Sequence, residues 1–213
     1  MITCKCPANA ALTTIPAQGC AQSFGQIQKV AFQRLQSAGV ENHLTIEDIP
    51  LLAEWTPLLT ATDGTKIVVS PYIQAPTVEA GAARTFGGGN ETLGGVEMVI
   101  GREPTTFQGV IRSVKQNIIV AMKELQCEAQ ADNLGVYLFD ENGHIGCLCD
   151  DYTNTSELMP IPIKSLFVGD KKFGGLEEPD SNAIQWSFLP NWSDKFYIIE
   201  PLFNPLTDLV VSA

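Results

Sequence analysis

Residues 134–149 read LGVYLFDENGHIGCLC, and they predict a β-hairpin. Its turn is the segment Asp140-Glu141-Asn142-Gly143, because Asn-Gly is the strongest short hairpin signal in a sequence. Apolar residues dominate both flanks, 134–139 and 144–149, which we expect to pair as antiparallel strands.

Further strands are predicted on both sides of this hairpin. In 26–35, Val30 and Phe32 alternate with polar neighbours, which favours a strand, with a short helix as the competing interpretation. Pro160 and Pro162 place the beginning of another strand at a sheet edge. The other predicted strands are 66–70, 96–100, 159–168, 183–189 and 196–199.

One long helix is predicted over about 107–128. Its apolar stripe recurs at the period of an α-helix and consists of Val110, Val114, Ile118, Met122 and Leu125. We therefore expect Ile118 to be buried and an aspartate there to destabilise the fold.

A second, shorter helix is predicted within 45–61. Thr45 is its candidate N-cap, and apolar residues such as Trp55 follow at helical spacing. Pro50 and Pro57 should keep this helix short or broken, because proline lacks the N–H that a helix interior requires.

The whole chain, 1–213, is predicted to be one domain of the α+β class. We expect a β-sandwich or a barrel-forming sheet with one long flanking helix. Residues 1–25 predict an extended N-terminal arm, and 201–213 predict another arm. Residues 74–95 are rich in glycine and predict a long loop between strands, or a long flexible hairpin.

The composition restricts the class of protein. Hydrophobic residues make up 45% of the 213 residues, so the chain can bury a core and is not predicted to be disordered. The formal net charge of −11 repels nucleic-acid phosphates, which disfavours a DNA-binding protein that reads sequence. A protein that lets DNA pass without adhering is compatible with this charge.

The chain carries no sequence signal for a membrane or for secretion. No window of about 18 uninterrupted apolar residues occurs, and the N-terminus lacks an apolar signal segment. We expect the protein to fold in a bacterial-type cytosol, where its six cysteines are free thiols or metal ligands rather than disulfides.

Two Cys-x-Cys pairs are the candidate metal ligands: Cys4 with Cys6, and Cys147 with Cys149. Four thiolates suit zinc, but on a straight strand the two sulfurs of each pair splay by roughly 6–7 Å. We therefore expect Cys147 and Cys149 to be small apolar residues that face a core or an interface, and we predict no metal site.

His144 with Cys147 or Cys149 is the one arrangement that suggests a base and a nucleophile. His144 follows a hairpin turn, where side chains are usually exposed, and no third group that would orient it is apparent. The Gly-x-Ser-x-Gly, His-Glu-x-x-His and Walker-type motifs do not occur. We predict that the protein is not an enzyme and has no catalytic or cofactor-binding residues.

Three other patterns have both a chemical and a structural interpretation. The glycines at 87–89 suggest a phosphate loop, but Glu91 and further glycines follow them instead of a helix N-terminus, which favours a mobile loop. The acidic pair at 150–151 suggests a cation site, with solvated loop charge as the default. Trp192, in a Pro-Asn turn, suggests glycan stacking, although packing between subunits is favoured.

Three stretches carry a resemblance to structural proteins encoded by phages and prophages of Bacteroidetes-type bacteria. They are GCAQSFGQIQK at 19–29, RTFGGGNET at 84–92 followed by IGREPT at 100–105, and LPNWSD at 189–194. The order of predicted elements also resembles that of bacteriophage tail tube proteins, the major tail proteins. None of the three stretches is a catalytic signature.

This resemblance implies a virion tail subunit that forms rings, hexameric in that family. The rings stack into a conduit for viral DNA, which passes without sequence recognition. Residues 74–95 would match the loop that bridges rings, and 107–128 the flanking helix. The implied partners are further copies of the chain and other tail proteins (terminator, tape measure, and baseplate or distal tail proteins), without a membrane. Assembly would take place in the cytoplasm of the bacterial host.

Several alternatives share this kind of sequence. A head–tail connector or ring protein, a head decoration protein and an injection-system tube subunit are all compatible with an acidic, β-rich chain. A glycan-binding β-sandwich that uses Trp192 is the more distant alternative.

Overall fold

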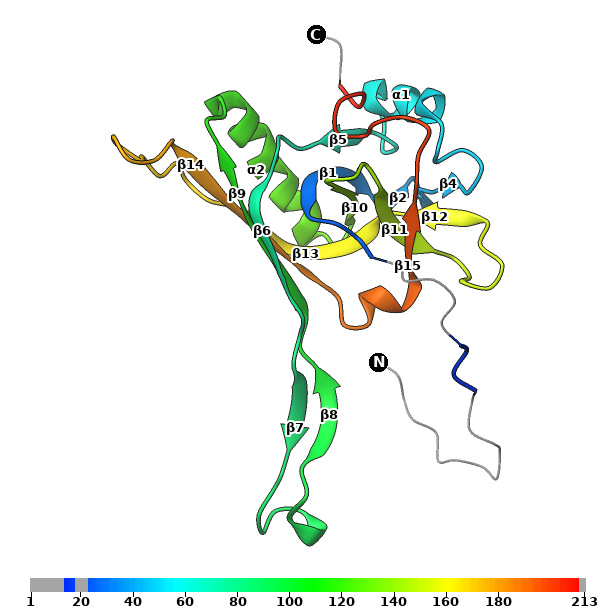
Figure 1. The fold of residues 1–213 in the computed structure, drawn as a ribbon, viewed down its shortest axis with the longest axis vertical. Helices are drawn as coiled ribbons and strands as arrows, with labels where there is room; N and C mark the ends of the chain where they lie inside the picture. Colours follow the sequence, from blue (N-terminus) through cyan, green and yellow to red (C-terminus); the bar gives the residue numbers. More distant parts are fainter. Residues whose placement is uncertain (1–13, 18–22, 211–213) are drawn as a thin grey trace.

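The computed structural model describes residues 14–17 and 23–210 of the chain. Their regular structure is mostly antiparallel β-sheet, with two α-helices and a hairpin that projects from the body (Figure 1). The strands of the main sheet are β1 (Ile27–Arg34), β4 (Leu44–Thr45), β5 (Ile67–Val69), β6 (Gln74–Glu79), β9 (Thr105–Arg112), β10 (Leu134–Asp140), β11 (Ile145–Cys149), β12 (Glu157–Met159), β13 (Ile161–Val168), β14 (Ser181–Phe188) and β15 (Phe196–Ile199). The other elements are β2 (Gln36–Ser37), β3 (Val40–Glu41), β7 (Ala83–Phe86), β8 (Met98–Arg102), α1 (Leu52–Thr60), α2 (Gln116–Gln130) and the 3-10 helices η1 (Leu93–Gly95) and η2 (Trp192–Lys195). The α+β class is therefore confirmed.

The main sheet curls back on itself. Its strands follow the order β4-β12-β11-β10-β13-β14-β9-β6, and β1 pairs with β10 on one edge and with β5 on the other. Just before β6, the N–H groups of Ser70 and Ile73 donate to the carbonyls of Val30 and Gln28 in β1, at 2.8 and 2.7 Å. The far end of the sheet thus returns to β1, and the curl surrounds an apolar core.

Two apolar cores lie on the two faces of β10, whose residues are all buried. Val136 and Leu138 face the first core, inside the curl, where α2 and the stacked pair of Phe107 and Trp186 also pack. Tyr137 and Phe139 face the second core, which is covered by α1. The apolar run of β10 is continuous because both of its faces are buried, whereas a strand with one solvated face alternates.

The hairpin 134–149 is confirmed, and β10 pairs with β11 across the predicted turn. Strands are also found where they were predicted in 26–35, 66–70, 96–100, 159–168, 183–189 and 196–199. In 45–61 the short helix is confirmed as α1, which contains Pro57, but it begins after Leu51, while Thr45 lies in β4.

The predicted helix over 107–128 is wrong in its first part. Residues 105–112 form β9, whose buried side chains Phe107 and Ile111 show the period of a strand. The chain turns at Ser113, where φ is 54°, and α2 begins only at Gln116. Val110 lies in β9, so its helical spacing to the later apolar residues was coincidental.

The predicted buried face of this helix is only partly right: Met122 is buried and Leu125 packs against the first core, as predicted, but Ile118 is not buried. Ile119, Met122 and Ala129 are the buried residues of α2, whereas the side chain of Ile118 is 39% exposed. The observed buried stripe packs on the first core along β13 and β10, and Ile119 takes the place that was predicted for Ile118.

The structure bears on only one of the two predicted terminal arms. Most of the N-terminal arm, 1–25, lies outside the described residues. Residues 201–210 do not extend as an arm, because Leu206 and Leu209 are buried in the second core and Leu202 N–H donates to the carbonyl of Pro50 at 2.9 Å.

Candidate functional site

A hairpin arm, residues 83–102, projects from the body of the molecule (Figure 1). β6 and β9 pair within the main sheet, and beyond them the chain continues into β7 and β8, which pair only with each other. For residues 74–95, the sequence predicted either a long loop or a long hairpin. The structure shows that this segment contributes strands to a long hairpin, which confirms the second alternative.

The base of the hairpin arm is fixed to the body. Glu103 N–H donates to the carbonyl of Ala82 at 2.9 Å, and Arg102 Nη1 donates to Asn191 Oδ1 at 2.8 Å. Gly81 lies so close to Glu103 that a Cβ at position 81 would overlap the Glu103 carbonyl oxygen. A residue with a side chain therefore cannot occupy this position unless the base of the arm shifts.

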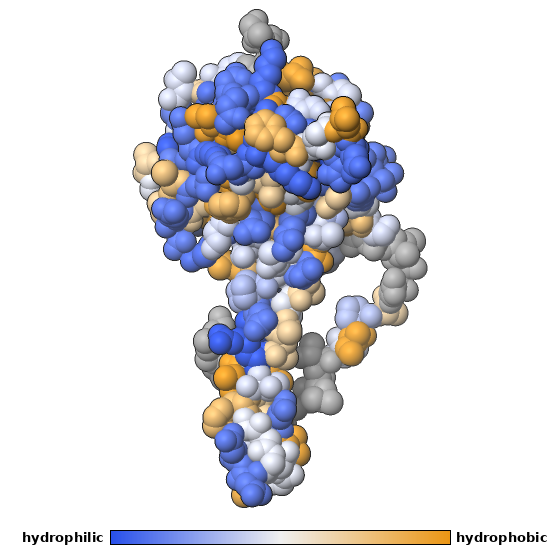
Figure 2. Space-filling model, turned by 90° about the vertical axis from the view of Figure 1, so that its left-hand side faces the viewer, coloured by the Kyte–Doolittle hydropathy of each residue, from blue (hydrophilic) through white to orange (hydrophobic). Residues whose placement is uncertain are grey.

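The hairpin arm exposes a concentration of large apolar side chains. Each is at least 57% exposed, and none belongs to either core. They are Phe86, Leu93, Val96, Met98, Val99 and Ile100. Figure 2 shows apolar residues along the arm, interspersed with polar ones, below a body whose visible face is also mixed in polarity. Contiguous exposed apolar surface marks interaction sites on soluble proteins.

Glycines shape the tip of the arm. Gly87, Gly88 and Gly89 have φ values of 86°, 112° and 55°, in the left-handed region that glycine enters without strain. Thr92 Oγ1 accepts a hydrogen bond from Gly88 N–H at 3.1 Å and donates to the carbonyl of Val96 at 2.7 Å. A 3-10 turn and a strand follow, so the helix N-terminus that a phosphate loop requires is not formed at this tip.

The charges of the arm are balanced. Arg84 and Arg102 oppose Glu91 and Glu97 within 83–102, although the whole chain has a formal net charge of −11. The arm is thus an electrically neutral, apolar projection from an acidic protein.

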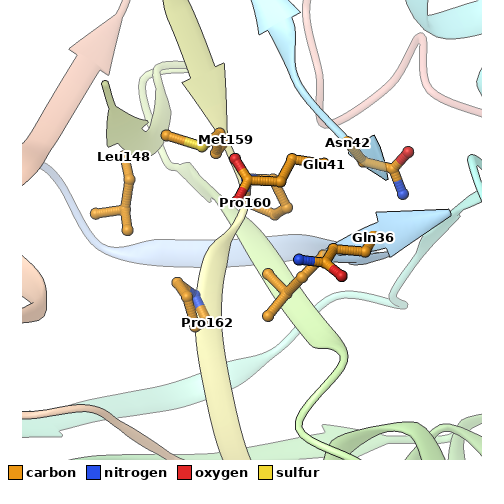
Figure 3. A pocket seen from close by; sticks show the side chains of 8 residues that line it. Gln36, Glu41, Asn42, Leu148, Met159, Pro160 and Pro162 are labelled. Carbon is orange, nitrogen blue, oxygen red and sulfur yellow. The ribbon is translucent and has the colours of Figure 1, made fainter. Parts of the chain in front are cut away.

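A small apolar pocket of about 180 Å³ lies between the β2–β3 hairpin and the beginning of β13 (Figure 3). Its apolar lining residues are Leu35, Leu148, Met159, Pro160 and Pro162, and Glu41 is its one acidic residue. The lining offers apolar contact but no pair of groups for acid–base chemistry.

A wider, open hollow of about 480 Å³ lies beside the β10–β11 turn and the C-terminal segment. Glu200 and Asp208 are its acidic residues. The Asp208 carboxylate already accepts hydrogen bonds from Asn204 N–H at 2.9 Å and from Thr207 Oγ1 at 2.8 Å. These bonds stabilise the fold of the C-terminal segment.

His144 has an orienting partner that the sequence did not reveal. Nδ1 of His144 lies 2.9 Å from Oδ2 of Asp140, whose side chain is completely buried. The Asp140 carboxylate also accepts hydrogen bonds from the N–H groups of Gly25, Asn142 and His144, at 2.8–2.9 Å. Burial raises the pKa of the Asp140 carboxyl, but these hydrogen bonds outweigh burial and hold the pKa below its ordinary value.

The candidate nucleophiles Cys147 and Cys149 lie inside the protein. Cys147 and Cys149 are buried in the second core, where their Sγ atoms lie 3.7 and 3.4 Å from the carbonyls of Tyr197 and Lys195. Burial raises the pKa of the Cys147 thiol far above its usual range, so the reactive thiolate is disfavoured. The interpretation of both residues as small apolar core residues is confirmed.

The proposed pairing of two Cys-x-Cys motifs involves Cys4 and Cys6, which lie outside the described residues, as does Cys20. Within 14–17 and 23–210, no group of three or more histidine, cysteine, aspartate or glutamate side chains is arranged to hold a metal ion. In the 150–151 pair, hydrogen bonds from Ser156 lower the pKa of the Asp150 carboxyl, and Asp151 accepts from Thr153. These carboxylates cap their own loop.

The three tryptophans pack against other residues of their own chain. Trp55 and Trp186 are buried in the second and the first core. Trp192 stacks on Phe188, with ring centroids 4.5 Å apart, and meets Phe196 edge-on at 5.4 Å. One ring face of Trp192 is therefore occupied by its own chain, which weakens the glycan-stacking interpretation.

Comparison with models of known protein families gives no match, and comparison with curated protein sequences gives none either. No helix of the described residues is long and apolar enough to cross a membrane. The geometry of the chain itself is thus the basis for inferring a function, and the hairpin arm is its most distinctive surface.

Proposed function

We propose that the chain is a structural subunit that assembles with copies of itself, and that the assembly is a bacteriophage tail tube. The observation that carries this proposal is the hairpin arm, which holds six large apolar side chains in solvent, away from both cores.

Elementary energetics favour docking of the arm. An isolated two-stranded hairpin is at best marginally stable in water, and the arm lacks the third strand or packed helix that would support it. Each Å² of apolar surface that docking removes from water contributes roughly 25 cal/mol. Free strand edges and exposed apolar residues on one projection therefore favour contact with another chain.

Three features support a tail tube in particular. The arm, 83–102, overlaps the segment 74–95 for which the resemblance to tail tube proteins implies a bridging role. A curled antiparallel sheet and the helix α2 supply a body of the corresponding class. The acidic charge suits a conduit, because like charge keeps DNA from adhering as it passes.

On this proposal the partners are further copies of the chain, then the other tail proteins, with viral DNA passing through the lumen. The protein acts in the virion tail after assembly in the host cytoplasm, and it performs no catalysis. Its function lies in the contacts between subunits.

Electron microscopy of the purified chain tests the proposal. Negatively stained samples over a range of concentrations should show rings or hollow tubes, and class averages would give the symmetry. A chain that stays monomeric at every concentration would contradict the proposed function.

A further inference from the structure

Strand β8 and the residues before it carry an unusual pattern for an exposed strand. Val96, Met98, Val99 and Ile100 are all large and apolar, and only Glu97 interrupts them. All four apolar side chains are exposed in the single subunit.

These side chains occupy both faces of the arm. Met98 lies opposite Phe86 across the hairpin, and Val99 lies opposite Thr85. Because successive side chains of a strand point to opposite faces, Phe86 and Met98 share one face, while Val99 projects from the other face beside Thr85 and Glu97.

Two other strands of the same chain provide the comparison. β14 has one solvated face, and its buried Ile184 and Trp186 alternate with exposed Ala183 and Gln185. β10 is buried on both faces, and its apolar run is nearly continuous. Like β10, and unlike β14, β8 has a large apolar side chain on each of its faces, and Glu97 is the charged residue on the face of Val99.

We propose that the hairpin arm is inserted between surfaces of neighbouring copies of the chain, so that both of its faces are buried in the assembly. This inference rests on the proposed function. It adds that both faces of the arm contact other copies. An arm that packs on one surface would need only one apolar face.

The size and charge of the arm favour other copies of the chain as the partners between which it is inserted. The arm spans 83–102, and a standard-size protein interface takes about 20–30 residues from each side. Acidic copies repel one another, but the arm is neutral and adds nothing to that repulsion where it contacts another copy. Within the described residues, the body contacts the arm only near its base, so the rest of the arm is available to another chain.

Lysine substitutions on the two faces test the inference. Met98→Lys places an ammonium group on one face of the arm, and Val99→Lys places it on the other. If both faces are buried, each variant should raise the concentration at which assembly begins by about a hundredfold or more, because burying an unpaired charge is costly. Sedimentation velocity measures that concentration, and circular dichroism should show an unchanged fold.

Val40→Lys is the matched control. Val40 is also a valine on a short exposed strand, with 67% exposure against 69% for Val99, but it lies on the β2–β3 hairpin. Each lysine reduces the negative charge of the chain equally, so a general electrostatic effect would promote assembly alike in all three variants. The control should assemble as the wild type does, and a comparable loss in Val40→Lys would overturn the inference.

The outcomes separate the inference from the proposed function. If the wild type assembles and only one of Met98→Lys and Val99→Lys blocks assembly, the arm is covered on one face and the inference is wrong, while the proposed function stands. If neither variant blocks assembly, the inference is also wrong. If the wild type does not assemble at all, the proposed function fails, and the inference fails with it.

Discussion

At the scale of single residues, Asp140 connects parts of the chain that are distant in sequence. Its buried carboxylate accepts hydrogen bonds from Gly25 N–H, where the chain enters β1, and from Asn142 and His144 in the β10–β11 turn. An asparagine keeps the shape but replaces one acceptor oxygen with a donor group, which would face N–H groups that also donate.

We expect Asp140→Asn to lower the free energy of unfolding by about 1–3 kcal/mol at neutral pH. The pKa of Asp140 is lowered in the folded state, so its contribution is present above the ordinary pKa and is lost as pH falls through the folded value. The difference in the free energy of unfolding between variant and wild type should therefore become smaller at acid pH. Chemical denaturation at several pH values measures it, and exposed Asp194→Asn serves as the control.

Gly81 and Gly101 form a second pair for comparison, both near the base of the arm. A Cβ at position 81 would overlap the Glu103 carbonyl, whereas a Cβ at position 101 has nothing within 4 Å. We expect Gly81→Ala to displace the arm and weaken assembly at least tenfold, and Gly101→Ala to have little effect. Sedimentation velocity compares the two variants, and equal behaviour would mean that the orientation of the arm does not matter.

The structural role of a residue is easier to predict from the sequence when residues next to it along the chain determine that role. Asn142-Gly143 identified its turn, because the turn is specified by the local backbone. The partnership of Asp140 with Gly25 was not predictable, since it joins residues 115 positions apart. The fully buried position of Asp140 likewise depends on the tertiary fold.

At the scale of elements, α2 shows how a regular pattern can mislead. Apolar residues at helical spacing predicted a helix from 107, but β9 and the turn at Ser113 occupy its first part. Pairing of β9 with β14 over its whole length outweighs the local preference. The hydrophobic pattern identified a helix in this region and its buried Met122, but not the first residue of the helix or the burial of Ile119 in place of Ile118.

Two aspartate substitutions on α2 test which face is buried. Ile119→Asp should lower the free energy of unfolding by about 3 kcal/mol or more, because it places an unpaired charge in the first core. Ile118→Asp should cost less than about 1 kcal/mol, since its side chain reaches solvent. Chemical denaturation measures both, and the reverse order of the two effects would contradict the position of the helix.

The arm was only partly predictable. Its glycines and the strand at 96–100 were evident in the sequence, and a hairpin was one of two alternatives. That the hairpin leaves the body was not evident, because apolar residues in a sequence normally predict a core. Their exposure is visible only once the rest of the fold has filled both cores with other side chains.

At the scale of the whole molecule, acidic charge and an apolar arm oppose each other during assembly. In the proposed assembly, a formal net charge of −11 repels approaching copies, while burial of the arm would attract them. Salt screens the repulsion, with a Debye length of about 10 Å at 0.1 M, but leaves apolar contacts intact.

We therefore expect assembly to begin at a lower concentration as ionic strength rises from about 0.02 to about 0.5 M, over which screening becomes effective. Light scattering against sodium chloride concentration measures this effect. If added salt dissolves the assemblies instead, ion pairs rather than apolar contacts hold the subunits together.

Sedimentation velocity of the wild type beside a variant that lacks Thr85–Gly95 is the most direct test of the role of the arm. This deletion removes the tip of the arm, which contributes to neither core. We predict that the wild type forms large species with increasing concentration, while the variant stays monomeric and unfolds at the same temperature. Equal assembly of both chains would contradict the account, and so would a variant that fails to fold.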